Sequence, residues 1–123
     1  MIPALLTMPL GGGLWIREYG FTKEAILNAQ LQSLLSISDY ARIAGDGEAR
    51  GVATRMELAS RNLLPRFDTG CWSLYQLGGS PAPLAYHRYH VFLLKQLAAR
   101  DPAWREAADR WAGYLRSGGC ANT

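Results

Sequence analysis

Apolar residues recur along the first half of the chain at roughly the 3.6-residue spacing of an α-helix, and they predict a pair of helices. Thr22 can cap the first helix, which is expected to end near Gly45. Asp46 or Gly47 begins the second, and Pro65 stops it. The apolar positions are Leu27, Leu31, Leu34, Leu35, Ile37 and Ala41 in the first helix, and Ala49, Val52, Met56, Ala59 and Leu63 in the second.

The second half of the chain repeats this organisation. A third helix is predicted from about Tyr86, and Asp101 followed by Pro102 is expected to cap a fourth. Their apolar positions are Val91, Leu94 and Leu97, then Trp104, Ala108, Trp111 and Leu115. The sequence thus predicts an all-α fold of about four helices in two antiparallel hairpins, arranged as part of an (α/α) toroid. A single domain is expected over residues 1–123, because no change in composition marks a boundary.

Two segments do not follow the helical pattern. Residues 14–19 mix bulky and polar side chains after three glycines, which favours a short strand. Residues 66–83 hold three glycines and two prolines around the β-prone island 71–75. This composition predicts a loop or small hairpin between the two helix pairs.

Composition excludes some function classes. The chain has 123 residues with 49% hydrophobic and 19% charged, and its net charge of +3 is spread without a Lys/Arg run. No nucleic-acid partner and no membrane segment are therefore expected. Residues 1–10 are apolar but short and carry two prolines, so they predict neither a signal peptide nor a spanning helix, and they suggest the truncated front of a longer protein. Cys71 and Cys120 are expected as free thiols, with a disulfide as the alternative.

The chemically distinctive side chains gather in or beside the two non-helical segments. They are Trp15, Arg17, Glu18 and Tyr19 in the first, and Asp68, Trp72, Tyr75, Tyr86, His87 and His90 in or just after the second. Aromatic faces suit the C–H side of a sugar ring, while phenol, carboxylate and imidazole groups bond its hydroxyls. The same residues also have structural interpretations: core or loop packing for the tryptophans, and a turn for Asp68–Thr69–Gly70. No metal site is expected, since His87 and His90 lack a third ligand at a suitable spacing.

Five of these segments, in the same order, resemble the D-glucuronyl C5-epimerase family. The matching segments are Gly11–Tyr19, which looks like the family's E-Y-P strand with Gly20 for the proline; Asn28 with the helix ending Leu35–Tyr40; Phe67–Leu77, similar to Y-D-T-G-x-x-x-x-Y-D-L; Tyr86–His90, similar to Y-H-x-x-H; and Arg110–Leu115, similar to R-W-x-x-Y-L. The resemblance runs from about residue 11 to 116. It implies the C-terminal helical domain of a longer enzyme.

The resemblance also implies a reaction, the inversion of C5 of D-glucuronate to L-iduronate within a heparan-type polymer. A base must remove the C5 proton from one face of the sugar, and an acid must return it from the other. By position, Glu18, Tyr19, Tyr75 and Tyr86 match the family's catalytic residues, with Glu18 and Tyr86 as the opposed proton carriers. Asn28 matches a substrate-binding residue, and His87, His90 and Arg17 are the nearby groups expected to contact substrate. Neither cofactor nor metal is implied.

Departures from the family pattern keep other functions open. Gly78 stands where the family has an arginine three residues after its tyrosine, a side chain suited to clamp the sugar carboxylate. The alternatives are a non-catalytic carbohydrate-binding or assembly subunit, and an (α/α)-toroid lyase or hydrolase that would use Glu18 and Asp68. The expected partner is a uronic acid-containing polysaccharide. The expected completion of the site is a missing N-terminal region or a homodimer; the compartment stays open, although animal family members are luminal in the Golgi.

Overall fold

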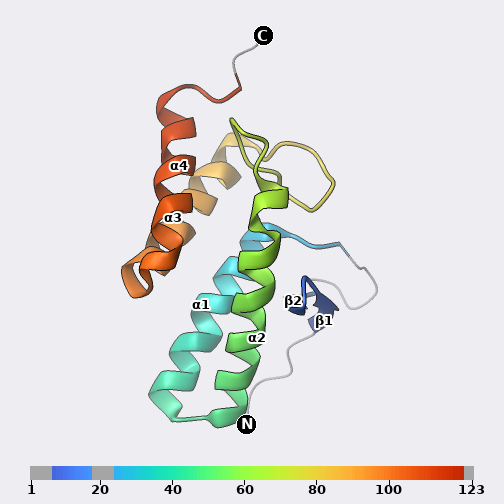
Figure 1. Cartoon of the computed structure of the whole chain (residues 1–123), viewed down its shortest axis with the longest axis vertical. Helices are drawn as coiled ribbons and strands as arrows, with labels where there is room; N and C mark the ends of the chain where they lie inside the picture. Colours follow the sequence, from blue (N-terminus) through green and yellow to red (C-terminus); the bar gives the residue numbers. More distant parts are fainter. Residues whose placement is uncertain (1–6, 18–23, 121–123) are drawn as a thin grey trace.

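A computed structural model describes residues 7–17 and 24–120 of the chain, and the described part is mainly helical (Figure 1). Helix α1 (Leu27–Ala44) and helix α2 (Gly47–Leu63) form the first antiparallel hairpin. A short 3₁₀ turn, η1 (Leu64–Phe67), follows α2. Helix α3 (Leu84–Arg100), the 3₁₀ turn η2 (Pro102–Trp104) and helix α4 (Arg105–Arg116) form the second hairpin. The predicted all-α architecture of four helices in two hairpins is confirmed.

Local chemistry explains where these helices begin and end. The Asp46 carboxylate accepts hydrogen bonds from the backbone N–H groups of Glu48 and Ala49, which caps α2 as expected. The Asp101 carboxylate accepts from Ala103 N–H at the start of η2. Helix α1 begins later than predicted, at Leu27, and its N-cap residue Ile26 makes no side-chain cap. The proposed capping residue Thr22 lies outside the described residues.

The strand predicted near residues 14–19 is shorter and belongs to a hairpin. Strand β1 (Thr7–Leu10) pairs antiparallel with β2 (Gly13–Ile16), which ends three residues earlier than expected. Gly11 and Gly12 connect them with φ angles of 61° and 79°. A two-residue hairpin turn of this kind needs two positive φ values, which glycine adopts without strain. The two glycines were the available signal for the hairpin.

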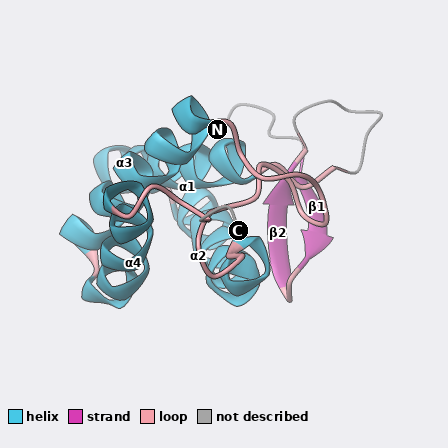
Figure 2. Cartoon of the chain, turned by 90° about the horizontal axis from the view of Figure 1, so that it is seen from above, coloured by secondary structure: helices cyan, strands magenta, loops and turns pink. Residues whose placement is uncertain are grey.

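A buried glutamine attaches this hairpin to the first helix pair. Gln30 on α1 is fully buried; its Oε1 accepts from Ile16 N–H at 2.7 Å, and its Nε2 donates to the Leu14 carbonyl at 3.0 Å. The same Nε2 lies 3.2 Å from the Met56 carbonyl and 3.0 Å from Ser60 Oγ, both on α2. One amide therefore links a strand to two helices, and Figure 2 shows the hairpin beside α2, on the side away from α4.

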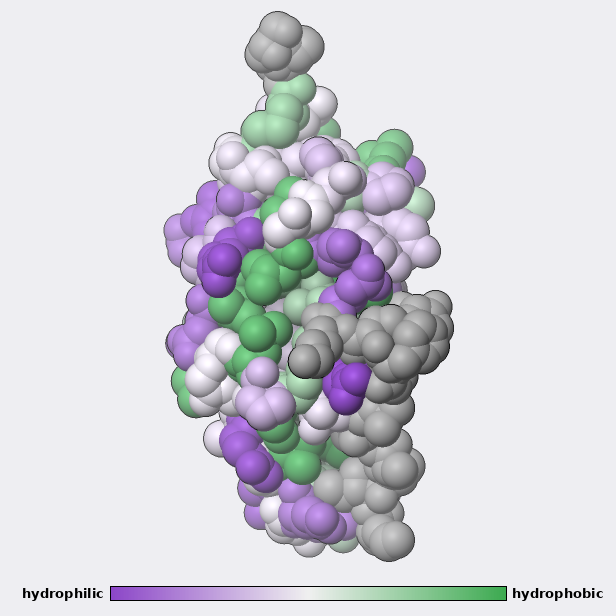
Figure 3. All heavy atoms as spheres, turned by 90° about the vertical axis from the view of Figure 1, so that its right-hand side faces the viewer, coloured by the Kyte–Doolittle hydropathy of each residue, from purple (hydrophilic) through white to green (hydrophobic). Residues whose placement is uncertain are grey.

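The core lies where α1 packs between α2 and α3. The largest fully buried side chains include Trp15 from β2, Phe67 from η1 and Trp111 from α4, so all parts of the described chain contribute. Trp15 and Phe67 stack with ring centroids 5.5 Å apart. Trp104 and Trp111 are core residues, as their spacing predicted. On the face drawn in Figure 3, apolar atoms gather in the middle of the described surface, with hydrophilic atoms around them.

Candidate functional site

Tyr75 and Tyr86 lie against each other where the loop meets α3. Their ring centroids are 4.8 Å apart and the ring planes are 72° apart, an edge-to-face contact. Tyr75 N–H donates to the Ser80 carbonyl at 3.1 Å, and Tyr86 lies in the first turn of α3. The Tyr86 side chain is 40% exposed, whereas Tyr75 is half-buried. The prediction that the loop places Tyr75 beside Tyr86 is confirmed.

Asn28 directly follows a residue whose backbone is hydrogen-bonded to Tyr75. It occupies the first turn of α1, and the neighbouring Leu27 N–H donates to the Tyr75 carbonyl at 3.1 Å. The Asn28 side-chain oxygen is buried without a hydrogen-bond donor among the described residues. The structure therefore brings three predicted site residues, Asn28, Tyr75 and Tyr86, to one end of the helices.

His87 and His90 turn inward from α3, and both are fully buried. Their Nδ1 atoms lie 2.7 Å and 2.9 Å from the hydroxyl of Ser73, which is buried as well. Burial lowers the pKa of His90 to about 3, with a further contribution from the charge of His87, and burial also lowers the pKa of His87. Both imidazoles are accordingly neutral at pH 7. Their predicted contact with substrate stays a prediction, because all their contacts here are internal.

Asp68 of the Asp–Thr–Gly segment is the polar centre of the second helix pair. Its carboxylate accepts hydrogen bonds from Arg110 Nε at 3.0 Å, Trp111 Nε1 at 3.1 Å and the Tyr114 hydroxyl at 2.7 Å. It also accepts from Gly70 N–H at 2.9 Å, which confirms the predicted turn. The two sequence segments that resemble D-T-G and R-W-x-x-Y-L are thus one hydrogen-bonded cluster.

Charge and burial oppose each other at Asp68. Burial alone would raise the pKa of its carboxyl, but the bonds from Tyr114, Gly70, Trp111 and Arg110 outweigh it and lower that pKa below the ordinary value. The carboxylate is therefore ionised at neutral pH and already fully engaged by donors from α4. This occupancy favours a structural role for Asp68 over a catalytic one.

The two cysteines form a disulfide, so the prediction of two free thiols is wrong. Cys71 and Cys120 are bonded with their Cα atoms 4.8 Å apart. After α4 the backbone turns back, with Gly119 N–H donating to the Tyr114 carbonyl at 2.8 Å. This turn brings Cys120 to the loop. It also lays Gly119 against the indole of Trp72, whose ring stacks on His87 with centroids 3.8 Å apart.

The remaining predicted groups lie either in other segments of the described chain or outside the described residues. Glu18 and Tyr19 lie outside the described residues, so their positions relative to Tyr86 stay predictions. Arg17 is half-buried just after β2. Gly78 has a φ of 72°, in a turn closed by the bond from Gly79 N–H to the Gln76 carbonyl. The position of the family's arginine is therefore here a left-handed turn residue.

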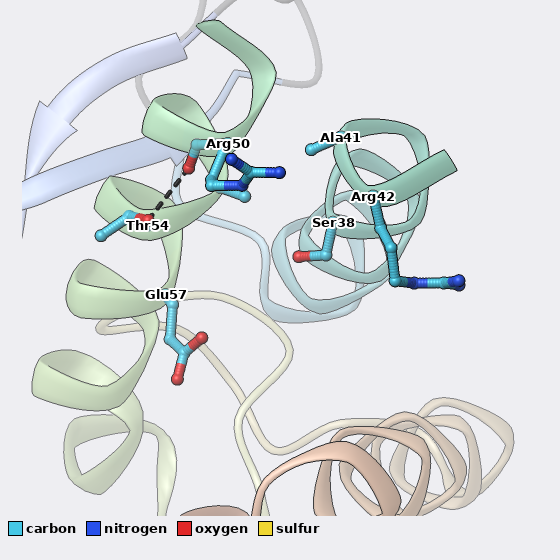
Figure 4. A pocket seen from close by; sticks show the side chains of 7 residues that line it. Ser38, Ala41, Arg42, Arg50, Thr54 and Glu57 are labelled. Atoms are coloured by element: carbon cyan, nitrogen blue, oxygen red, sulfur yellow. Dashed lines mark hydrogen bonds between the residues drawn. The ribbon is translucent and has the colours of Figure 1, made fainter. Parts of the chain in front are cut away.

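A separate hollow of about 350 Å³ lies between α1 and α2, lined by Ser38, Ala41, Arg42, Arg50, Ala53, Thr54 and Glu57 (Figure 4). Several of its polar groups are engaged within their own helices. The Thr54 hydroxyl donates to the Arg50 carbonyl, and Arg42 pairs with Asp39. None of the predicted site residues that the structure describes lines this hollow.

Within residues 7–17 and 24–120, no three His, Cys, Asp or Glu side chains gather closely enough to hold a metal ion. None of the helices in the described part of the chain combines the length and apolar character that crossing a bilayer requires.

Sequence reasoning missed Ser73 and the central position of Asp68. The burial of the histidines had a signal, because His87, His90, Leu94 and Leu97 follow one apolar face of α3. Their common partner Ser73 had none, since it lies in an irregular loop.

Comparison with known proteins gives consistent results. The sequence pattern of the D-glucuronyl C5-epimerase C-terminus matches residues 6–113. A D-glucuronyl C5-epimerase of Caenorhabditis elegans is 32% identical to the chain over 125 aligned positions, which cover 84% of this chain and 20% of that relative. The chain therefore spans about a fifth of the length of this relative.

Proposed function

The chain belongs to the D-glucuronyl C5-epimerase family, and we propose that it carries part of the catalytic site of a uronate C5-epimerase. In this proposal the substrate is D-glucuronate within a heparan-type polymer, and the product is L-iduronate. The observation that supports it most strongly is the contact between Tyr75 and Tyr86, two phenols from separate segments at one accessible place.

The chemistry requires proton transfer on both faces of C5. The C5 hydrogen is weakly acidic because it is α to a carboxylate, so negative charge must be stabilised on the carboxylate oxygens as the proton leaves. One group removes the proton, and a second group returns a proton from the opposite face. A phenol can return the proton if it lies within reach of C5, and it can remove the proton from C5 in its phenolate form, which a neighbouring cation favours.

The residues divide these roles as follows. Tyr86, the more exposed phenol, faces the sugar as one proton carrier, and Tyr75 orients it through the edge-to-face contact. Glu18, assisted by Tyr19, is the opposed carrier. Asn28 is the substrate-binding residue of this set, and Arg17 offers its charge to the carboxylate. His87 and His90 do not face the sugar in this proposal; their hydrogen bonds with Ser73 hold α3 to the loop.

Solvent exchange at C5 tests the proposal directly. A full-length form that contains this chain is incubated with a glucuronate-containing heparan-type polymer in deuterated water, and deuterium at C5 and iduronate are measured by mass spectrometry and NMR. We expect Tyr86→Phe to reduce the exchange rate at least about 100-fold, the low end of acid–base contributions. Tyr89→Phe is the matched control, because Tyr89 is on the same helix but stacks on Phe92.

Two results would contradict the proposal. Exchange that persists in Tyr86→Phe would remove this residue from the chemistry. Cleavage of the polymer, or unsaturated chain ends, would instead indicate a hydrolase or a lyase.

A second candidate function has one observation in its favour. Gly78 replaces the family's arginine, and its left-handed turn leaves no side chain there to clamp a carboxylate. A non-catalytic subunit that binds the polysaccharide would tolerate this loss. Binding of the polymer without any deuterium at C5, measured on the same samples, would favour the binding subunit.

A further inference from the structure

Ser73 lies at the centre of a buried hydrogen-bond chain that links the loop to both helices of the second pair. Its Oγ is 2.7 Å from His87 Nδ1 and 2.9 Å from His90 Nδ1. At the far side of the first imidazole, His87 Nε2 lies 3.1 Å from the carbonyl oxygen of Trp111 on α4. Ser73 and both histidines are fully buried, so solvent offers them no alternative partners.

The chemistry of these groups permits one assignment of donor and acceptor to each of these hydrogen bonds. A carbonyl only accepts, so His87 Nε2 carries a hydrogen and donates it to Trp111. A neutral imidazole has one N–H, which makes His87 Nδ1 an acceptor for the single hydroxyl hydrogen of Ser73. The Ser73 oxygen is then an acceptor toward His90, whose Nδ1 must carry the hydrogen.

This assignment of donors and acceptors also explains why one buried nitrogen has no hydrogen-bond partner. His90 Nε2 is buried and has no hydrogen-bond partner among the described residues. In the order above that nitrogen is a bare lone pair, whereas the opposite tautomer would bury an N–H without an acceptor. It would also set two acceptors, Ser73 Oγ and His90 Nδ1, face to face at 2.9 Å. The two histidines are therefore opposite tautomers, with hydrogen on Nε2 of His87 and on Nδ1 of His90.

The hydrogen bonds from Ser73 to the two histidines connect the two segments that carry Tyr75 and Tyr86. Ser73 lies two residues before Tyr75, and His87 directly follows Tyr86. The loop is held from the other side by bonds from Leu74 N–H to the Phe67 carbonyl and from Ala82 N–H to the Ser73 carbonyl. The Ser73 hydroxyl is thus a buried polar contact between the Tyr75 segment and α3, next to the stacking of Trp72 on His87.

We propose that Ser73 is a positioning residue: its hydroxyl, donated to His87 and accepting from His90, holds Tyr75 against Tyr86. The catalytic relevance of this contact rests on the proposed function. The hydrogen-bond order itself does not, since it follows from the buried groups alone.

Imidazole ¹⁵N NMR tests the proposal without any need for turnover. In the oxidised chain at pH 7, long-range ¹H–¹⁵N correlations are expected to show opposite neutral tautomers for His87 and His90. Ser73→Thr keeps the hydroxyl and should keep both tautomers and the nuclear Overhauser effect between the Tyr75 and Tyr86 rings. Ser73→Ala removes the partner of His90 Nδ1, so it should abolish the fixed Nδ1–H tautomer of His90 and remove most of that ring-to-ring effect.

The contrary results are equally specific. Identical tautomers for the two histidines in the unmodified chain would overturn the proposal, as would unchanged tautomers and ring contact in Ser73→Ala. If Ser73→Ala does not fold, the unmodified chain and Ser73→Thr decide the question in the same way. Opposite tautomers together with no C5 exchange in the full-length form would contradict the proposed function and leave the role of Ser73 supported.

Discussion

The two helix pairs have similar helices but are joined to the rest of the molecule differently. The α1–α2 pair packs on a regular β-hairpin, and one neutral side chain, Gln30, makes the buried polar contacts between them. The α3–α4 pair packs on an irregular loop, which an ionised carboxylate, a buried serine and a disulfide attach at three places. The segments that resemble the family's D-T-G, Y-H-x-x-H and R-W-x-x-Y-L all lie in this second region.

This difference indicates what the motif residues do. A regular strand satisfies its backbone through a partner strand, but an irregular loop needs side chains to hold it in one conformation. Asp68, His87, Arg110 and Tyr114 supply such contacts around the loop. Most of the recognisable residues in the second region therefore hold the loop in place, whereas Tyr86 is an exposed side chain beside it.

Of the changes considered, Asp68→Ala should cause the largest loss of stability, and the loss should arise in the second region. The change leaves the donors of Arg110, Trp111 and Tyr114 without their common acceptor, which should lower the free energy of unfolding by about 3–5 kcal/mol. Urea unfolding measures the loss. Asp39→Ala is the control, because Asp39 is an exposed carboxylate paired with Arg100 and should cost less than about 1 kcal/mol. Equal losses in the two variants would contradict the central place of Asp68.

Gln30→Leu should weaken the first region and spare the second. It leaves Ile16 N–H and the Leu14 carbonyl without their buried partner, at an expected cost of about 2–3 kcal/mol. Gln32→Leu, on the exposed side of α1, should change stability by less than about 0.5 kcal/mol. Amide exchange should accelerate in the β-hairpin while the ring contact between Tyr75 and Tyr86 persists. Loss of that contact would show that the two regions are not independent.

Acid should destabilise the second region first. The pKa values of His87 and His90 are lowered by burial from 6.5, so the unfolded chain binds protons more readily as pH falls below that value. Their contribution to stability is complete above pH 6.5 and is lost as pH falls toward the folded pKa, about 3 for His90. Each histidine can contribute a slope of up to about 1.4 kcal/mol per pH unit.

Asp68 acts in the same direction over a lower range. Its pKa is lowered from 3.8, so its contribution begins to fall only near that value. The chain has two histidines, and a loss of stability between pH 6.5 and about 5 therefore reports mainly on them. The free energy of unfolding should fall less steeply with decreasing pH in His90→Leu than in the unmodified chain. A free energy that does not change with pH in the unmodified chain would contradict the lowered pKa values of the two histidines.

The helices could be predicted from the sequence because the signals that determine them are local. The apolar spacing and the capping residues Asp46 and Asp101 lie within a few residues of the structure that they determine. The site depended on contacts between distant segments: Asp68 and Arg110 are 42 positions apart, and Cys71 and Cys120 are 49 apart. Periodicity says nothing about such pairs. The resemblance to a family placed Tyr75 beside Tyr86, but the residues that hold them there became visible only in the fold.

The measurement that tests this account most directly is the nuclear Overhauser effect between the Tyr75 and Tyr86 rings in solution at neutral pH. The unmodified, oxidised chain should show it, and Asp68→Ala should lose most of it while contacts within the α1–α2 pair persist. A ring contact that survives in Asp68→Ala would contradict the claim that the polar contacts of the second region position the tyrosine pair.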